Sequence, residues 1–233
     1  MQDKWKEIWN RRPRLLEEVT LDALIKADGF DVGAGQVDVD NWQKYIQDIS
    51  KQIYLKDTDT IFEIGCGAGA FIYPFFLKGH KVAGTDYSKI MVNLAKKSMP
   101  GMVFESKDAV QFETSYKYDI VLSNSVFQYF DSFEYAKKVI LKMVSASKRM
   151  VVILDINDVA RKEDAMITRR GRLSQIEYKE KYDGLSHLFY DKEWFKAIAE
   201  ECNCNIEIHN QDIDDYLNSK FRFNVFLTKN NKS

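Results

Sequence analysis

Short apolar runs alternate with amphipathic stretches along the chain from Thr60 onward. The apolar runs predict strands at 60–64, 81–85, 102–105, 120–122 and 150–154. After Asp86, Ser88 is placed to cap a helix whose apolar residues follow the 3.6-residue period, and segment 131–144 shows the same period. This alternation is typical of a parallel sheet whose strands are joined by crossover helices.

The two ends of the chain have different patterns. The first sixty residues read as helical, and Asp40 is placed to cap a helix that contains Trp42 and Tyr45. Pro74 falls near the start of the first crossover helix, so it must occupy the first turn or kink the helix. Near the C-terminus the pattern predicts a helix at 194–202 and strands at 206–209 and 221–227.

A glycine-rich turn follows the first predicted strand. Gly65, Gly67 and Gly69 stand on alternate positions, which lets the backbone turn sharply and approach a bound nucleoside closely. Asp86 comes about twenty residues later, at the end of the next strand, where a carboxylate can bind both hydroxyls of a ribose. The pattern therefore predicts a cofactor built on adenosine.

Two classes of cofactor use such a turn, and charge separates them. The spacing of Gly65, Gly67 and Ala70 also satisfies the dinucleotide pattern. A pyrophosphate, however, needs free N–H groups and no carboxylate beside the turn. Glu63 stands two residues before the first glycine. This acid suits S-adenosylmethionine, which carries a sulfonium and an ammonium and no phosphate.

Two further motifs follow along the chain. Asp108, in the run 106–109, is placed to accept a hydrogen bond from an adenine amino group. Segment 118–129 reads as a strand that runs into a loop over the site. With these motifs in family order and spacing, the chain resembles the class I S-adenosylmethionine-dependent methyltransferases of the small-molecule type.

The resemblance implies a single α/β domain with a Rossmann-like fold. Its sheet would have seven mostly parallel strands, with helices on both faces, an antiparallel last strand and an N-terminal helical cap. Residues 1–56 would form the cap or lid, and residues 57–156 the cofactor-binding core. Residues 157–190 would cover the acceptor, and residues 191–233 would supply the last helix and strand pair.

The resemblance also assigns cofactor-binding residues by position. Gly65 and Gly67 would bring backbone against the methionine part, and Glu63 would orient the loop or meet the ammonium. Asp86 would hold the ribose, and Asp108 would bind the adenine amino group. The full predicted set is Glu63, Gly65, Cys66, Gly67, Asp86, Tyr87, Ser88, Asp108, Ala109 and Ser123.

The acceptor side is less defined. Methyl transfer needs a base only when the nucleophile must lose a proton of high pKa. His187 is the candidate base and Tyr190 a second catalytic candidate; the alternative for His187 is a structural histidine. A carboxylate or phosphate-like oxygen would need no base and would suit an arginine. The predicted acceptor-binding residues are Trp9, Arg12, Phe127, Tyr129, Arg169 and Tyr182.

Composition limits the class of protein, the cellular location and the partners that we expect. The 233 residues, 45% hydrophobic and 30% charged, fit one globular domain, and no apolar run approaches the ~20 residues that span a bilayer. A net charge of −1 does not favour a nucleic-acid partner. The N-terminus lacks a signal-peptide core, and the three cysteines form no metal-ligand pattern. We therefore expect a cytoplasmic, reducing location and no membrane partner.

We expect a methyltransferase that acts on a small polar acceptor, with oxygen favoured over nitrogen, in a bacterial metabolite or surface-glycan pathway. The absence of proline at 123–126 disfavours enzymes that methylate base amines, and acids at 155–158 supply only half of a magnesium site. No metal is therefore expected. The alternatives are an NAD(P)-dependent oxidoreductase, a non-catalytic binding module and an aminopropyl transferase.

Overall fold

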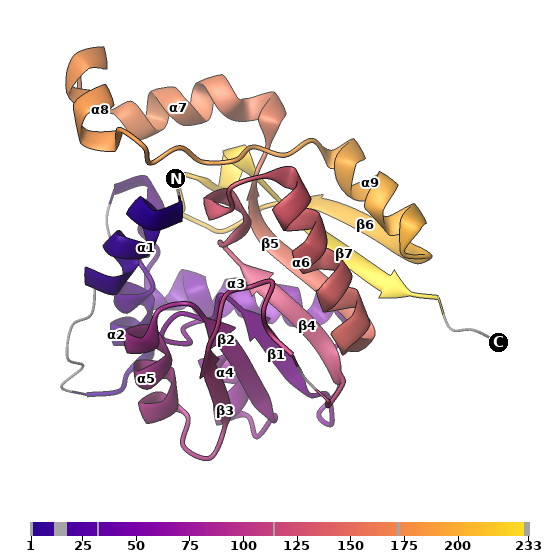
Figure 1. Ribbon diagram of the computed structural model, residues 1–233. Helices are drawn as coiled ribbons and strands as arrows, with labels where there is room; N and C mark the ends of the chain where they lie inside the picture. The colour runs from indigo at the N-terminus through magenta and orange to yellow at the C-terminus, as the bar shows by residue number, and fades with distance from the viewer. Residues whose placement is uncertain (1, 12–17, 32, 114, 172, 231–233) are drawn as a thin grey trace.

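The computed structural model describes residues 2–11, 18–31, 33–113, 115–171 and 173–230 (Figure 1). Seven strands form one sheet in the order β3-β2-β1-β4-β5-β7-β6. They are β1 (Ile61–Ile64), β2 (Val82–Asp86), β3 (Val103–Ser106), β4 (Tyr118–Asn124), β5 (Ser147–Asn157), β6 (Cys204–Asn210) and β7 (Arg222–Lys229). Strand β7 is antiparallel to both of its neighbours, and the other pairs are parallel. The predicted fold class is confirmed.

Helices cover both faces of the sheet, and each face has its own apolar cluster. Side chains of α2, α3, α4 and α5 pack on one face, and those of α6 and α9 pack on the other. The helices are α1 (Gln2–Arg11), α2 (Leu21–Ala27), α3 (Val39–Gln52), α4 (Tyr73–Leu77), α5 (Lys89–Ser98), α6 (Phe133–Ala146), α7 (Lys162–Arg170), α8 (Gln175–Tyr182) and α9 (Lys192–Glu201).

The sequence explains this arrangement strand by strand. All four residues of β1 are buried, as expected for a parallel strand covered on both faces. Ile61 packs into the cluster beneath α3 and α5, and its neighbour Phe62 packs into the cluster beneath α6. Successive side chains point to opposite faces of a sheet, so a continuous apolar run is needed to fill both clusters.

The helix starts test three predictions. Ser88 caps α5 by accepting a hydrogen bond from the Met91 N–H, as predicted. Pro74 lies in the first turn of α4, where its missing N–H costs no helix hydrogen bond, so the helix is not kinked there. The prediction for Asp40 was wrong, because Asp38 accepts the Asn41 N–H at 2.8 Å and is the N-cap of α3. Asp40 lies within the first helical turn.

The segment 157–190 forms α7 and α8, which lie beyond the carboxyl end of β5 (Figure 1). The glycine-rich turn leaves the carboxyl end of β1, next to the ends of β2 and β4. In open α/β sheets, ligands bind at this edge. Across the described ranges, no helix is long and apolar enough to cross a membrane.

Candidate active site

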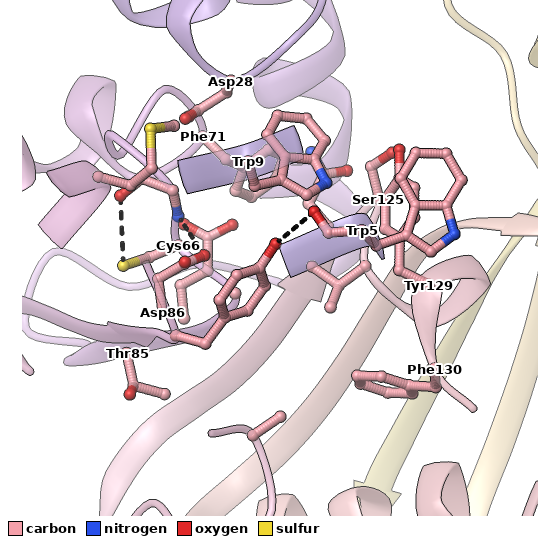
Figure 2. Close-up of a pocket in the computed structure, with 18 of the residues that line it drawn as sticks. Trp5, Trp9, Asp28, Cys66, Phe71, Thr85, Asp86, Ser125, Tyr129 and Phe130 are labelled. Carbon is pink, nitrogen blue, oxygen red and sulfur yellow. Dashed lines mark hydrogen bonds between the residues drawn. The ribbon is translucent and has the colours of Figure 1, made fainter. Parts of the chain in front are cut away.

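A cavity opens at the carboxyl ends of β1, β2 and β4 (Figure 2). The space within it is about 960 Å³, a figure that includes open solvent at its mouth. Aromatic side chains from distant parts of the chain line it, and acids line the side nearest the glycine turn. The aromatic lining comprises Trp5, Trp9, Phe30, Trp42, Phe71, Tyr87, Tyr129, Phe130 and Tyr135.

Asp28, just beyond α2, holds the glycine turn in place. Its carboxylate accepts the Ala68 N–H at 2.6 Å and the Ala70 N–H at 2.9 Å. The contact is so close that a Cβ added to Gly67 would lie 2.8 Å from Asp28 Cγ. Gly67 also has a positive φ of 52°, which favours glycine. The turn and the helical cap are therefore packed as one unit.

Asp86 fixes the same turn from the end of β2. One carboxylate oxygen accepts the Gly67 N–H at 3.1 Å, and the other accepts the Ser88 N–H at 2.8 Å. These two bonds orient the carboxylate at the cavity wall, and each oxygen keeps a further lone pair for a ligand. The position is the one predicted from the sequence.

Glu63 completes a group of three acids in the cavity wall, in which Glu63 is buried and Asp28 and Asp86 are partly buried. Its Oε2 atom is buried and has no hydrogen-bond partner. In the part of the chain that the structure describes, no lysine or arginine pairs with Asp28, Glu63 or Asp86. A buried acid such as Glu63 is costly without a partner, so a cationic ligand beside this group would be favoured.

The pKa values of these acids report the same environment. Burial raises the pKa of Asp28 to about 7, against the lowering effect of the turn amides. The charge of Asp86 adds a smaller rise. Burial likewise raises the pKa of Asp86 to about 6, against the lowering effect of its two amide donors. Burial and then the charges of Asp28 and Asp86 raise the pKa of Glu63 well above its usual value.

This arrangement does not fit a pyrophosphate. A phosphate at a glycine turn is bound by free backbone N–H groups. Here Asp28 occupies the N–H groups of Ala68 and Ala70, and Asp86 occupies that of Gly67. A phosphate would also face three acids at close range. The donor set fits a ligand with positive charge and an adenosine, and it disfavours a dinucleotide.

Helix α1 forms the wall opposite the sheet. Trp5, Lys6 and Trp9 line the cavity, and the Tyr87 hydroxyl donates to the Trp5 carbonyl at 3.3 Å (Figure 2). Lys6 lies 3.6 Å from a carboxylate oxygen of Asp108. On its other side, Trp5 Nε1 donates to the Ser186 carbonyl at 3.2 Å. The helix thus joins the cofactor-binding core to the segment 157–190.

Comparison with known families and structures agrees with this geometry. Residues 62–149 match a family described as methyltransferase domain. The match begins inside β1 and covers the glycine turn, Asp86 and Asp108. The match supports a Rossmann-like S-adenosylmethionine-dependent methyltransferase.

Solved structures share the fold over nearly the whole chain. Magnesium protoporphyrin IX methyltransferase from Synechocystis PCC 6803, solved with bound S-adenosylmethionine, has a TM-score of 0.64 at 14% identity, and the alignment covers 98% of this chain and 97% of that one. DesVI of Streptomyces venezuelae has a TM-score of 0.63 at 13% identity, covering 91% and 100%. At this identity the likeness shows the fold alone.

Curated relatives match over shorter stretches. Malonyl-[acyl-carrier protein] O-methyltransferase 1 of Ilyobacter polytropus is 33% identical over 76 residues, 30% of this chain and 28% of that protein. A protein of Invertebrate iridescent virus 6, provisionally assigned as methyltransferase 235L, is 24% identical over 145 residues, 60% of this chain. The match spans about half the length of the viral protein, 55%, and less of the other.

Most residues expected to bind the methyltransferase cofactor line the cavity. They are Glu63, Gly65, Cys66, Gly67, Asp86, Tyr87, Asp108 and Ala109. The other two support the lining from behind, since Ser88 caps α5 and donates its N–H to Asp86, and the Ser123 hydroxyl donates to the Ile64 carbonyl at 2.9 Å. Asp108 also accepts a hydrogen bond from the Tyr135 hydroxyl.

Only some of the residues predicted for acceptor binding and catalysis line the cavity. Trp9 and Tyr129 line the cavity. Phe127 is buried beside the Tyr190 ring, and the Tyr190 hydroxyl donates to the Phe127 carbonyl at 2.8 Å, so neither borders the cavity. Arg12 lies outside the described residues.

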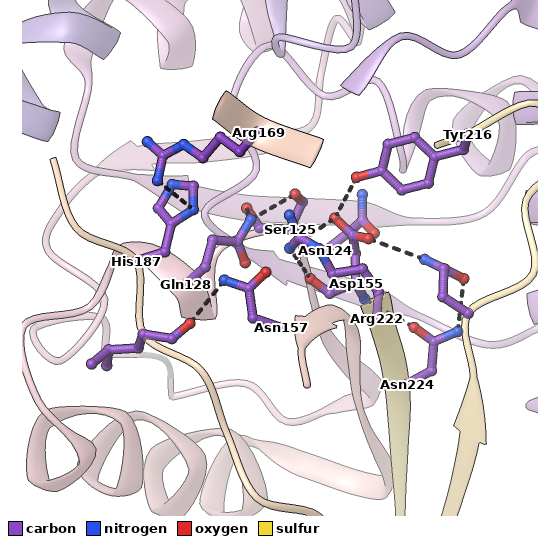
Figure 3. Close-up of polar contacts among 12 residues, drawn as sticks. Asn124, Ser125, Gln128, Asp155, Asn157, Arg169, His187, Tyr216, Arg222 and Asn224 are labelled. Carbon is purple, nitrogen blue, oxygen red and sulfur yellow. Dashed lines mark hydrogen bonds and ion pairs between the residues drawn. The ribbon is translucent and has the colours of Figure 1, made fainter. Parts of the chain in front are cut away.

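His187, Arg169 and Tyr182 do not line the cavity. Figure 3 shows Arg169 beside His187. The His187 ring stacks on Trp5 with a centroid distance of 5.0 Å and meets Tyr129 edge-on at 5.1 Å. Arg169 donates to His187 Nδ1 at 3.4 Å and to the Leu185 carbonyl at 3.2 Å, and its guanidinium lies 4.6 Å from the Tyr182 ring centroid. Burial first, then Arg169 and Arg222, hold the pKa of His187 well below its usual value.

Sequence reasoning missed Asp28 and Ser125. Asp28 lies 40 residues before the turn that it binds, and no sequence motif marks it. Ser125 lines the cavity at the end of β4 with a φ of 57°, which is uncommon for a residue other than glycine. Such backbone conformations cluster at functional sites, but no sequence motif marks this one.

Proposed function

We propose that this protein transfers a methyl group from S-adenosylmethionine to a small polar acceptor, with oxygen favoured over nitrogen. The observation that carries the proposal is the group of three acids in the cavity wall, Asp28, Glu63 and Asp86, around a glycine turn whose amides are already bonded. The match of residues 62–149 to the methyltransferase domain family supports it. The oxygen acceptor is supported by likeness to a relative named an O-methyltransferase.

In this proposal different cavity residues bind different parts of the cofactor. Asp86 binds the ribose hydroxyls, and Asp108 and Ala109 face the adenine. Glu63 and Asp28 provide negative charge for the ammonium and sulfonium, and Gly67 lets the backbone approach without a side chain. Cys66 and Tyr87 complete the wall by packing. When bound, S-adenosylmethionine supplies an electrophilic methyl group on a positively charged sulfur. The sulfur becomes neutral when the methyl group is transferred.

The protein's own contribution is orientation and exclusion of water. Methyl transfer is an in-line displacement, so the acceptor atom must be held along one direction. Trp9 and Tyr129 narrow the cavity on the side away from the glycine turn, and α1 closes it over the sheet. Residues 1–56 thus act as the cap and residues 157–190 as the acceptor cover.

Three free thiols support the predicted reducing compartment.

The direct test is transfer of tritium from S-adenosylmethionine labelled in its methyl group. We expect label in an acceptor from a panel of small alcohols, phenols, carboxylic acids and amines, with S-adenosylhomocysteine formed in equal amount. The Asp86→Ala variant serves as the matched negative control. Binding of S-adenosylhomocysteine without any methyl transfer would support a non-catalytic binding module instead.

Cofactor binding should depend on pH through Asp28 and Asp86. Their pKa values of about 7 and 6 in the folded protein lie above the usual aspartic acid value of 3.8. The two groups therefore stabilise the free protein below about pH 4 and lose this effect as pH rises through 6 and 7. A cationic cofactor favours the ionised acids. We therefore expect the rise in Tm caused by S-adenosylmethionine to grow between about pH 5 and 8.

Thermal unfolding with and without cofactor across this range measures the effect. In Asp28→Asn the rise in Tm should depend less on pH, because one of the two titrating acids is gone. A cofactor-induced rise in Tm that is equal at both ends of the range would contradict a role for these acids.

The base role of His187 stays a prediction, and a mutation separates it from a positioning role. Loss of a general base costs ~10²-fold or more in turnover. We expect His187→Ala to cost less than about tenfold, because the ring lies behind Trp5 and Tyr129 and is bonded to Arg169. The measurement is kcat against pH for both proteins. A ~10²-fold loss, together with loss of the acidic limb, would establish the base.

A further inference from the structure

We infer that Asn124 binds the carboxylate of the cofactor's amino-acid part, while Glu63 beside it binds the ammonium. This inference rests on the proposed function and extends it to the negatively charged group of S-adenosylmethionine. A carboxylate in a cavity walled by Asp28, Glu63 and Asp86 needs a hydrogen-bond donor, because the acids repel it. With this donor, the cavity selects a ligand that carries both charged groups of an amino acid.

Asn124 lies at the end of β4, next to the glycine turn. Strands β1 and β4 are parallel with Glu63 opposite Leu122, so Asn124 comes level with Gly65 and points to the same face of the sheet as Glu63. The loop after Asn124 contacts the turn closely, since a Cβ added to Gly65 would lie 2.4 Å from a methyl carbon of Val126. Asn124, Glu63 and Gly65 all line the cavity, at the end where the proposed function places the methionine part.

A chain of buried hydrogen bonds fixes which way the Asn124 amide faces. It starts at the Asp155 N–H, which donates to Asn224 Oδ1 at 2.9 Å. The Asn224 amide nitrogen is therefore the donor to Gln211 Oε1 at 3.0 Å, which leaves Gln211 Nε2 to donate to the Tyr45 hydroxyl oxygen at 3.3 Å. The Tyr45 proton then goes to Asn124 Oδ1, 3.0 Å away. Figure 3 shows Asn124, Asp155 and Asn224 in this buried region.

The amide group of Asn124 that remains for a ligand is therefore its NH₂. Asn124 is only 8% exposed, and among the described residues no oxygen accepts a hydrogen bond from its Nδ2 atom. Burial, followed by the charge of Asp155, raises the pKa of Tyr45 well above its usual value, so the hydroxyl keeps the proton that it donates. An unsatisfied donor in so buried a place costs free energy unless a ligand accepts from it.

Glu63 offers the opposite group at the same edge of the sheet. Its Oε2 atom is buried and has no hydrogen-bond partner. An amide donor on β4 and a carboxylate acceptor on β1 thus lie on neighbouring strands and on one face. The two match the carboxylate and the ammonium that an amino acid carries on a single carbon atom.

The lysines in the cavity wall are engaged away from the turn. Lys6 lies 3.6 Å from a carboxylate oxygen of Asp108, and Lys107 lies 3.0 Å from a carboxylate oxygen of Glu105. Asn124 is therefore a donor that remains available beside the turn. Because the amide is neutral, it can hold a carboxylate without cancelling the negative charge that favours the ammonium.

Asn124→Asp reverses the donor and tests the inference. The new side chain keeps the shape and can still accept from Tyr45, but it has no N–H for a carboxylate and adds a negative charge. We expect affinity for S-adenosylhomocysteine, measured by calorimetry, to fall by about 10²-fold. Asn205→Asp is the matched control, since Asn205 is exposed on the edge strand β6, and it should change the affinity by less than about twofold.

Two ligands without the carboxylate make this test specific. Methylthioadenosine lacks the whole amino-acid part, and decarboxylated S-adenosylhomocysteine keeps the ammonium and lacks only the carboxylate. We expect Asn124→Asp to bind methylthioadenosine within about threefold of the unaltered protein, and the decarboxylated ligand at least as tightly. The variant should therefore prefer the decarboxylated ligand to S-adenosylhomocysteine. Equal weakening of all three ligands would overturn the inference.

Asn124→Ala removes the donor without adding a charge, and it decides the matter if the aspartate variant does not fold. We expect it to bind S-adenosylhomocysteine about tenfold more weakly and methylthioadenosine with unchanged affinity. Unchanged affinity for S-adenosylhomocysteine, or a loss confined to KM for the methyl acceptor, would overturn the inference and leave the proposed function standing. Absence of S-adenosylhomocysteine binding to the unaltered protein would instead overturn the proposed function.

Discussion

Gly67→Ala is expected to abolish measurable cofactor binding. The added Cβ would lie 2.8 Å from Asp28 Cγ and closer still to one carboxylate oxygen. Asp28 is bonded to the Ala68 and Ala70 amides of the same turn and has no direction in which to retreat without losing those bonds. The positive φ of 52° adds strain for any residue with a side chain. We expect S-adenosylhomocysteine affinity to fall by at least ~10²-fold in calorimetry.

Gly79→Ala is the matched control. Gly79 has a φ of 90°, yet nothing lies within 4 Å of the position its Cβ would take. The variant shares the backbone strain of Gly67→Ala and lacks the collision. We expect some loss of stability and unchanged affinity for the cofactor. Equal affinities of the two variants would show that the contact between turn and cap does not shape the site.

Asp28→Asn should also have a large effect on cofactor affinity, because it removes the negative charge of the side chain and keeps its shape. Asp28 makes two charge-assisted hydrogen bonds to the turn, each worth ~1.5–3 kcal/mol, and faces the cavity beside Glu63. The amide can still accept from one backbone N–H but offers no charge to an ammonium. We expect S-adenosylhomocysteine to bind ~10–10²-fold more weakly.

Methylthioadenosine, which lacks the amino-acid part, shows what Asp28 does. If Asp28 acts on the ammonium, Asp28→Asn should weaken this ligand much less than S-adenosylhomocysteine. Equal weakening of both would mean that Asp28 only shapes the turn. Asp40→Asn is the control, since Asp40 is exposed and lies outside the cavity lining.

The cofactor half of the site was predictable because its signals are local. Gly65, Gly67 and Asp86 lie on successive strand ends that the parallel sheet must bring together, so spacing along the sequence gave their place in space. Pro74 was confined to the first turn by its own backbone chemistry. The seven-stranded, mostly parallel sheet with an antiparallel last strand followed from the family resemblance and was confirmed.

The rest depends on contacts between distant segments. Asp28 meets the turn across 40 residues, and Trp5 packs against His187 from the opposite end of the chain. No local sequence pattern distinguishes Asp28 from a surface acid or Trp5 from a core aromatic residue. Asp38 and Asp40 stand at the start of the same helix with equal capping chemistry, and only the entry path of the chain selects Asp38 as the cap.

Calorimetric titration of the unaltered protein with S-adenosylhomocysteine and, separately, with NADH tests the central claim most directly. If Asp28, Glu63, Asp86 and the occupied turn select an adenosine ligand with an ammonium group over a pyrophosphate, S-adenosylhomocysteine binds at one site per chain and NADH gives no heat of binding. Saturable binding of NADH that S-adenosylhomocysteine fails to displace would contradict the account.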